Sequence, residues 1–153
     1  MRIPYMPVPV KKPIPSLAGS VIRYRPVMGV RLTGSADSRL YDGLLDTGAD
    51  DTVFNAAIAD LLGIDLRNAE ELVISLAGRA KRLRCRNASV LLRITDGLQE
   101  TYEWTGTIGF VTAPLHYNLL GHAGFLQFFS ADFDGEARQV TLTPKRSFPG
   151  SRI

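Results

Sequence analysis

The chain has 153 residues, of which 45% are hydrophobic and 22% are charged, and its formal net charge is +3 at pH 7. This composition fits one globular domain with a core of its own, and no stretch approaches the roughly 20 apolar residues of a membrane-spanning helix. We therefore expect no membrane partner. The first residues lack the apolar segment of a secretory signal, and the single cysteine, Cys85, excludes a disulfide within the chain, so both features favour a cytoplasmic location.

Residues 1–20 hold five of the nine prolines of the chain. Proline fixes the backbone and lacks an N–H, so we expect extended or polyproline II backbone here rather than a helix. The segment is predicted to be a tail that is mobile or lies on the surface. Two alternatives stay open: a removable pro-segment, or a strand that crosses to a second subunit. The five prolines are Pro4, Pro7, Pro9, Pro13 and Pro15.

The next segment is predicted to form a hairpin. Apolar and β-branched residues at 21–32 predict a strand, and the polar residues 33–38 predict a turn. A second strand is expected at residues 40–45. This hairpin delivers the chain to the carboxylate of Asp46.

Residues 44–53 read Leu-Leu-Asp-Thr-Gly-Ala-Asp-Asp-Thr-Val. An apolar strand here runs into a tight polar turn that presents Asp46. Gly48 allows the backbone to approach a ligand or another chain closely, and Thr47 can form a hydrogen bond locally or to a partner. We interpret the stretch as a carboxylate held in a fixed place. The alternative is an ordinary turn, in which Asp and Gly are common.

A short helix is predicted for residues 55–63, where Asn55 is a good N-cap and Gly63 is a good C-terminal stop. After a connection that carries several charges, residues 73–86 predict a long hairpin with Gly78 at its tip.

The second strand of that hairpin is strongly basic. Because side chains alternate along a strand, Arg82, Arg84 and Arg86 share one face, while Leu83 and Cys85 share the other, which favours a buried and inert thiol. The arginine face is expected to be solvated, with binding of acidic peptides or of nucleic-acid phosphates as alternatives. The stripe has no interleaved aromatic residues for base stacking, so we expect no nucleic acid as a partner.

The remainder of the chain predicts strands at 89–95 and 101–111, and a C-terminal hairpin of residues 128–133 and 138–143. The two histidines, His116 and His122, are too few for a metal site, and no Gly-x-Ser-x-Gly motif accompanies them. We therefore expect neither a metal nor another cofactor.

Two motifs resemble those of the retroviral, or retropepsin-like, aspartic proteases. Residues 44–53 resemble the catalytic loop of that family. Residues 119–121, Leu-Leu-Gly, followed by a short helix, resemble the second signature, which packs behind the loop. The helix at 55–63 and the long C-terminal hairpin make the layout most similar to bacterial and cellular single-domain members.

The resemblance covers residues 25–143 and implies an all-β fold. The expected architecture is a single-lobe acid-protease (retropepsin-like) closed β-barrel with a flap hairpin, residues 73–86, and one or two short helices. We accordingly divide the chain into a Pro-rich N-terminal tail at 1–20, a retropepsin-like protease domain at 21–143 and a basic C-terminal tail at 144–153.

The resemblance implies that Asp46, Thr47 and Gly48 are the catalytic residues. Peptide hydrolysis of this kind needs two carboxylates about 3 Å apart that share a proton. The sequence contains one Asp-Thr-Gly, so the second Asp46 must come from an identical subunit. The substrate-binding residues implied by the resemblance are Ala49, Asp50, Asp51 and Val53 beside the loop, Leu76, Ala77, Gly78 and Arg79 in the flap, and Tyr117 and Leu119.

The family also has an arginine that forms an ion pair with the first aspartate of the Asp-Asp pair in the opposite subunit. This implies a pair between Arg25 and Asp50 of the partner subunit, and the alternative is a solvated arginine. The family commonly has arginine directly after the glycine of the second signature, where this chain has His122. Because histidine titrates near neutrality, we expect a weaker and pH-sensitive network around Asp50.

The sequence therefore predicts an aspartic endopeptidase that acts as a homodimer on peptide or protein substrates. The alternative is a non-catalytic module of the same fold that serves in dimerisation or peptide binding, with Asp46 vestigial. A basic nucleic-acid-binding domain is the third hypothesis.

Overall fold

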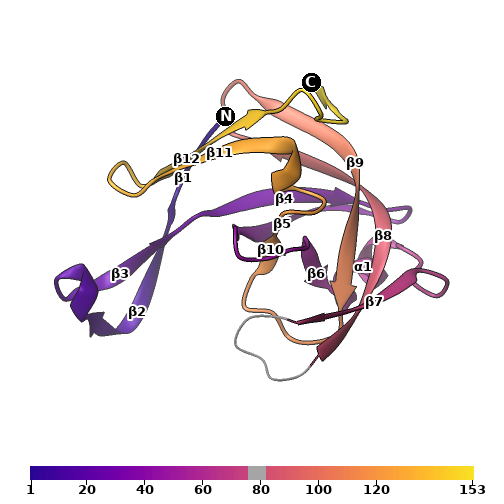
Figure 1. Cartoon of the computed structure of the whole chain (residues 1–153), viewed down its shortest axis with the longest axis horizontal. Coiled ribbons are helices and arrows are strands. Elements are labelled where there is room, and N and C mark those ends of the chain that lie inside the picture. The colour runs from indigo at the N-terminus through magenta and orange to yellow at the C-terminus, as the bar shows by residue number, and fades with distance from the viewer. Residues whose placement is uncertain (76–81) are drawn as a thin grey trace.

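The computed structural model describes residues 1–75 and 82–153, and strands dominate this part of the chain (Figure 1). One α-helix, α1 (Ala56–Leu62), and two single turns of 3-10 helix, η1 (Pro15–Leu17) and η2 (Leu126–Phe128), lie among the described residues. The strands are β1 (Arg2–Pro4), β2 (Met6–Ile14), β3 (Ser20–Arg25), β4 (Val27–Thr33), β5 (Ser38–Leu45), β6 (Val53–Asn55), β7 (Glu70–Ser75), β8 (Arg82–Thr95), β9 (Thr101–Val111), β10 (Asn118–Leu120), β11 (Phe129–Asp134), β12 (Gln139–Pro144) and β13 (Ser151–Arg152).

The largest sheet closes on itself as a barrel. Its strand order runs β13-β9-β6-β10-β5-β4-β8-β7, and β8 also pairs with β9. That antiparallel pairing extends from Cys85 opposite Val111 to Thr95 opposite Thr101, so the ring from β9 through β6, β10, β5 and β4 returns to β9 through β8. The closed β-barrel expected from the sequence is confirmed.

The barrel encloses the hydrophobic core. On β4 and β8, alternate residues such as Val30, Leu32 and Leu92 are fully buried, as the period of a strand with one buried face requires. At one end Trp104 is surrounded by three phenylalanines, with ring centroids 5.5 to 5.7 Å from its own. These are Phe125, Phe129 and Phe148.

The helix was predicted correctly because its signals are local. The side chain of Asn55 accepts a hydrogen bond of 2.9 Å from the Ala57 amide, and Gly63 ends the helix with a left-handed φ of 70°. The helix buries Ile58, Ala59 and Leu62 against the barrel.

Two strand predictions were wrong in their limits. The strand expected at 21–32 is divided at Pro26 into β3 and β4, since proline cannot donate to a ladder. The strands expected before and after residues 87–88 are one strand, β8. Asn87 continues the pairing because it lies opposite Glu70 of β7 and Gly109 of β9 at the same time.

The first residues have the extended backbone that the prolines predict, and they are ordered as strands. β1 pairs with β12, and β2 pairs with β3. At the other end, β13 pairs with β9. The boundaries at residues 20 and 144 stay predictions, although strands from both outer segments are added to the sheets of the body.

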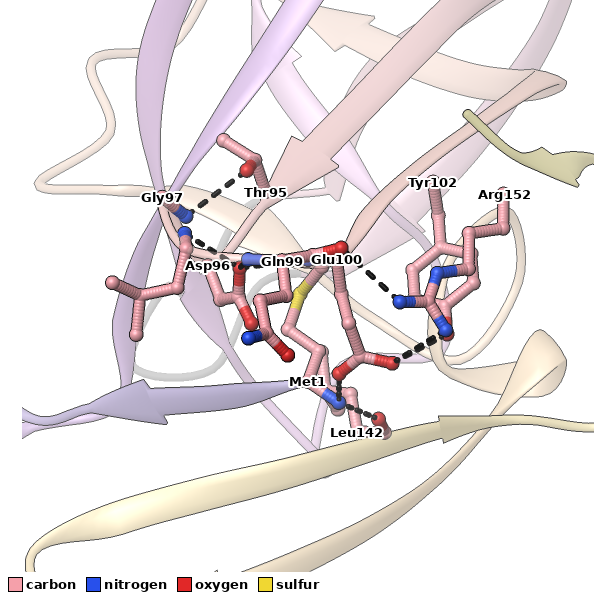
Figure 2. A network of polar contacts seen from close by, with 10 residues as sticks. Met1, Thr95, Asp96, Gly97, Gln99, Glu100, Tyr102, Leu142 and Arg152 are labelled. Carbon is pink, nitrogen blue, oxygen red and sulfur yellow. Dashed lines mark hydrogen bonds and ion pairs between the residues drawn. The ribbon is translucent and has the colours of Figure 1, made fainter.

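Both ends of the described chain meet at the turn between β8 and β9 (Figure 2). The buried amino group of Met1 forms an ion pair with Glu100 and donates a hydrogen bond of 3.1 Å to the Leu142 carbonyl oxygen. Glu100 also accepts a hydrogen bond of 3.0 Å from the Tyr102 hydroxyl and lies 3.8 Å from the Arg152 guanidinium. This network attaches β1 and β13 to the same turn.

None of the helices in the described part of the chain is long and apolar enough to cross a membrane.

Candidate active site

Backbone hydrogen bonds hold Asp46 in place in the loop that follows β5. The Asp46 amide donates to the Leu120 carbonyl oxygen at 3.2 Å, and the Ala49 amide donates to the Asp46 carbonyl oxygen at 3.2 Å. Oδ1 of Asp46 accepts a hydrogen bond of 2.9 Å from the Gly48 amide. The loop therefore fixes both the backbone and the side chain of this half-buried aspartate.

The Leu-Leu-Gly segment lies directly behind that loop, as the sequence predicts. β10 is inserted between β5 and β6, with Leu120 parallel to Leu45 and Leu119 opposite Val53. A Cβ on Gly121 would lie 2.7 Å from the Ala49 carbonyl oxygen, so glycine is required for this approach.

Backbone hydrogen bonds join the two segments beyond the glycine. The His122 amide donates to the Ala49 carbonyl oxygen at 2.9 Å, and the Ala123 amide donates to the Asp50 carbonyl oxygen at 2.8 Å. A third hydrogen bond comes from the buried Thr52, whose amide donates to the Ala123 carbonyl oxygen at 3.0 Å. The Asp46 loop is thus held from behind along most of its length.

In front of the loop is a pocket of about 550 Å³. Asp46 lines it together with most of the residues that the sequence predicted for the site. These are Arg25, Gly48, Ala49, Asp50, Asp51, Val53, Tyr117 and Leu119. Thr47 is exposed and does not line the pocket. The flap residues Leu76, Ala77, Gly78 and Arg79 lie outside the described residues, and the hairpin that leads to them is formed by β7 and β8.

Other lining residues were missed by the sequence prediction. Part of the wall comes from β7, and part from the connection between β9 and β10. The β7 residues belong to the hairpin predicted at residues 73–86, the connection lies directly before Tyr117, and Leu44 begins the predicted stretch 44–53, so nearness to predicted site residues was the available signal. The missed residues are Leu44, Val73, Ile74, Ser75, Pro114, Leu115 and His116.

Arg25 enters this pocket from the end of β3. Its guanidinium carbon lies 5.6 Å from the centroid of the Tyr117 ring, a cation–π distance. Within residues 1–75 and 82–153, neither Asp46 nor Asp50 forms an ion pair. The side chain of His122 is exposed, and its backbone makes the contact with the loop.

Cys85 has the inward direction expected of it. Its side chain is buried with Val53 and Val111, and its Sγ fills the space beside Gly109. Burial raises the pKa of the Cys85 thiol, and the negative charge of Asp51 raises it further. Both effects favour the protonated, unreactive form.

The opposite face of β8 is basic and exposed, as predicted. Arg84 and Arg86 each lie 3.5 Å from a carboxylate oxygen of Glu71 on β7. These cross-strand ion pairs offset part of the charge of the stripe.

Comparisons with known proteins support the fold. No family model matches the sequence, and no curated protein matches it. Among solved structures, a retropepsin-like aspartic protease from Rickettsia conorii is similar over 93% of this chain and 88% of its own, with a TM-score of 0.57 and 16% identity. The protease of EIAV, solved with an inhibitor, is similar over 64% of this chain and 82% of its own, with a TM-score of 0.44 and 20% identity.

The similarity to the Rickettsia structure is one of fold. The chain therefore has a retropepsin-like, single-lobe all-β fold, as its sequence predicts.

Proposed function

We propose that this protein is an aspartic endopeptidase that acts as a homodimer, with one Asp46 from each subunit in a shared site. The observation that carries the proposal is the placement of Asp46. Its carboxylate faces a pocket of about 550 Å³ while the Gly48 amide and the segment behind the loop hold it in position. Among the described residues, no cationic side chain forms an ion pair with this carboxylate.

The chemistry requires a second copy of this loop. Two carboxylates about 3 Å apart cannot both ionise, so one carries a proton while the other is charged. The charged Asp46 removes a proton from water as the oxygen attacks the peptide carbonyl carbon, and the protonated Asp46 donates its proton to the carbonyl oxygen. In the second step the Asp46 that took the proton from water donates it to the amine nitrogen as the C–N bond breaks. The other Asp46 takes a hydroxyl proton from the tetrahedral intermediate, so the carboxylic acid product forms and the pair again shares one proton.

The pocket wall supports peptides as the substrate class. Ile74 and Leu115 offer apolar surface in the pocket of Asp46 and also pack against the buried cluster of Val53, Cys85 and Val111. An extended peptide with an apolar side chain next to the scissile bond fits such a wall. We further propose that Arg25 pairs with Asp50 of the partner subunit, which the exposed position of Asp50 at the pocket leaves accessible.

The test is cleavage of a mixed peptide library between pH 4 and 7, read by mass spectrometry. The wild-type protein should produce new termini, and Asp46→Asn should abolish them with an unchanged circular dichroism spectrum. Asp42→Asn, at an exposed position on β5, the strand that leads into the Asp46 loop, is the matched control and should retain activity. Peptides that bind without being cleaved, or equal cleavage by Asp46→Asn, would contradict the proposal; the first result would favour a binding module.

A further inference from the structure

Residues 6–25 form an arm that extends from the barrel (Figure 1). In the described part of the chain, its strands β2 and β3 hydrogen-bond as a sheet only with each other, from Met6 opposite Arg25 to Ile14 opposite Ser20. A hairpin of two strands without a packed face is marginally stable in water. The arm therefore needs a surface on which to pack.

The base of the arm is fixed to the body. The Tyr5 amide donates a hydrogen bond of 2.7 Å to the Arg138 carbonyl oxygen, between β11 and β12. The Arg138 guanidinium carbon lies 4.0 Å from the centroid of the Tyr24 ring. These contacts set the direction of the arm at its origin.

That origin is next to the candidate active site. The Pro26 carbonyl oxygen, one residue beyond the arm, accepts a hydrogen bond of 2.9 Å from the amide of Leu45, which precedes Asp46. Arg25, the last residue of the arm, lines the pocket of Asp46. A two-fold axis that brings two Asp46 residues together must therefore pass close to the base of both arms.

The outer part of the arm exposes apolar side chains. Three large apolar side chains on the arm are exposed to solvent: Leu17 by 47%, Val21 by 52% and Ile22 by 38%. Val21 and Ile22 are neighbours on β3 and therefore point to opposite faces of the arm, so exposed apolar side chains are present on both faces. Lys11, Lys12 and Arg23 add a charged border, as in the rim of a protein interface.

Both edges of the arm are protected against strand addition. On β2, prolines at positions 7, 9 and 13 remove backbone donors. On β3, the Ser20 hydroxyl accepts a hydrogen bond of 3.1 Å from the Ile22 amide and donates one of 3.0 Å to the Ile22 carbonyl oxygen. Contact through the faces of the arm is therefore favoured over contact through its edges.

We propose that the arm packs on a second copy of this chain, so that two arms related by the two-fold axis hold the dimer together. The inference rests on the proposed homodimer and names the element that stabilises it. β3 has six residues and spans roughly 20 Å, which is enough to cross from the axis onto the body of a partner. Leu17 and Val21, the two most exposed of these apolar residues, are the contacts of the arm in this arrangement.

The experiment compares the double variant Leu17→Glu, Val21→Glu with Leu98→Glu. Leu98 is 87% exposed in the turn between β8 and β9, so it controls for a new charge at an exposed leucine. Sedimentation velocity over a dilution series should give a dimer Kd that is about tenfold or more higher for the arm variant and unchanged for Leu98→Glu. Peptide cleavage by the arm variant should fall at low protein concentration and recover at high concentration.

A second measurement tests the same contact if the double variant does not fold. A nitroxide label on Val21→Cys reacts at that site alone, because Cys85 is buried. Its spectrum should show an immobilised label in concentrated samples and a mobile one on dilution. A label that is equally mobile at every concentration, an unchanged Kd, or a wild-type protein that is monomeric throughout would overturn the inference.

The outcomes separate the two proposals. If the arm variant has a raised dimer Kd but the wild type cleaves no peptide, the arm contact is supported and the peptidase is rejected. Cleavage that Asp46→Asn abolishes, together with an unchanged Kd in the arm variant, retains the peptidase and rejects the arm contact.

Discussion

Gly121 lies against the back of the Asp46 loop, where a Cβ would stand 2.7 Å from the carbonyl oxygen of Ala49. We expect Gly121→Ala to lower the free energy of unfolding by about 1 to 3 kcal/mol, because the loop must move to admit the methyl group. Urea denaturation measures this change, and peptide cleavage should fall with it. Gly135→Ala is the control, since a Cβ there meets no atom within 4 Å. Equal stability of the two variants would contradict the close packing.

The polar contacts at the turn between β8 and β9 should make the free energy of unfolding depend on pH in the acid range. The Met1 amino group, and then the Tyr102 hydroxyl, lower the pKa of Glu100 below its ordinary value. A lowered pKa in the folded state stabilises the protein above the unfolded pKa, and this contribution is lost as pH falls through the folded pKa. Below about pH 4.5 the free energy of unfolding should therefore fall less steeply for Glu100→Gln than for the wild type. Thermal unfolding from pH 3 to 6 tests this, with Glu136→Gln as an exposed control.

A shared site predicts a particular response to inactive subunits. Excess Asp46→Asn protein added to dilute wild type should lower peptide cleavage, because mixed dimers hold one carboxylate instead of two. The same excess of Asp42→Asn protein should raise it. The rate of the wild type alone should depend on the square of protein concentration at low concentration. First-order dependence down to isolated monomers would exclude a shared site.

A transition-state analogue provides an independent check of the chemistry. A statin-type peptide, whose hydroxyl replaces the attacking water, should inhibit cleavage far more strongly than the matching peptide without that hydroxyl. Equal inhibition by both peptides would contradict catalysis by a pair of carboxylates.

Cys85 should be unreactive in the folded protein. Its side chain is 1% exposed and the pKa of its thiol is raised. A chromogenic disulfide reagent should react with it only at the rate of unfolding, and rapidly in denaturant. Fast reaction in native buffer would show that the cluster of Val53, Cys85 and Val111 opens readily.

The parts of this fold that could be predicted depend on local chemistry. Asn55 and Gly63 each act within one helical turn, and the Asp46 loop bends at its own glycine. Pairings between distant segments could not be predicted in the same way. That β10 lies between β5 and β6 could be expected only from the resemblance to a known family, because no local sequence pattern specifies which strands pair.

The lining of the pocket shows the same limit. His116 and Ile74 line the pocket of Asp46 because the fold places β7 and the segment before β10 around it, and no local sequence pattern specifies that placement. The arm was ambiguous for a different reason. Its prolines restrict the backbone to extended conformations, which suits a mobile tail and a paired strand equally well.

The single tryptophan provides a natural spectroscopic probe of one end of the molecule. Trp104 contacts Phe148, which belongs to the segment leading into β13, as well as Phe125 and Phe129. Detachment of the last residues from the barrel would hydrate the indole and move its emission to longer wavelength. Intrinsic fluorescence can therefore report whether this segment is attached to the barrel.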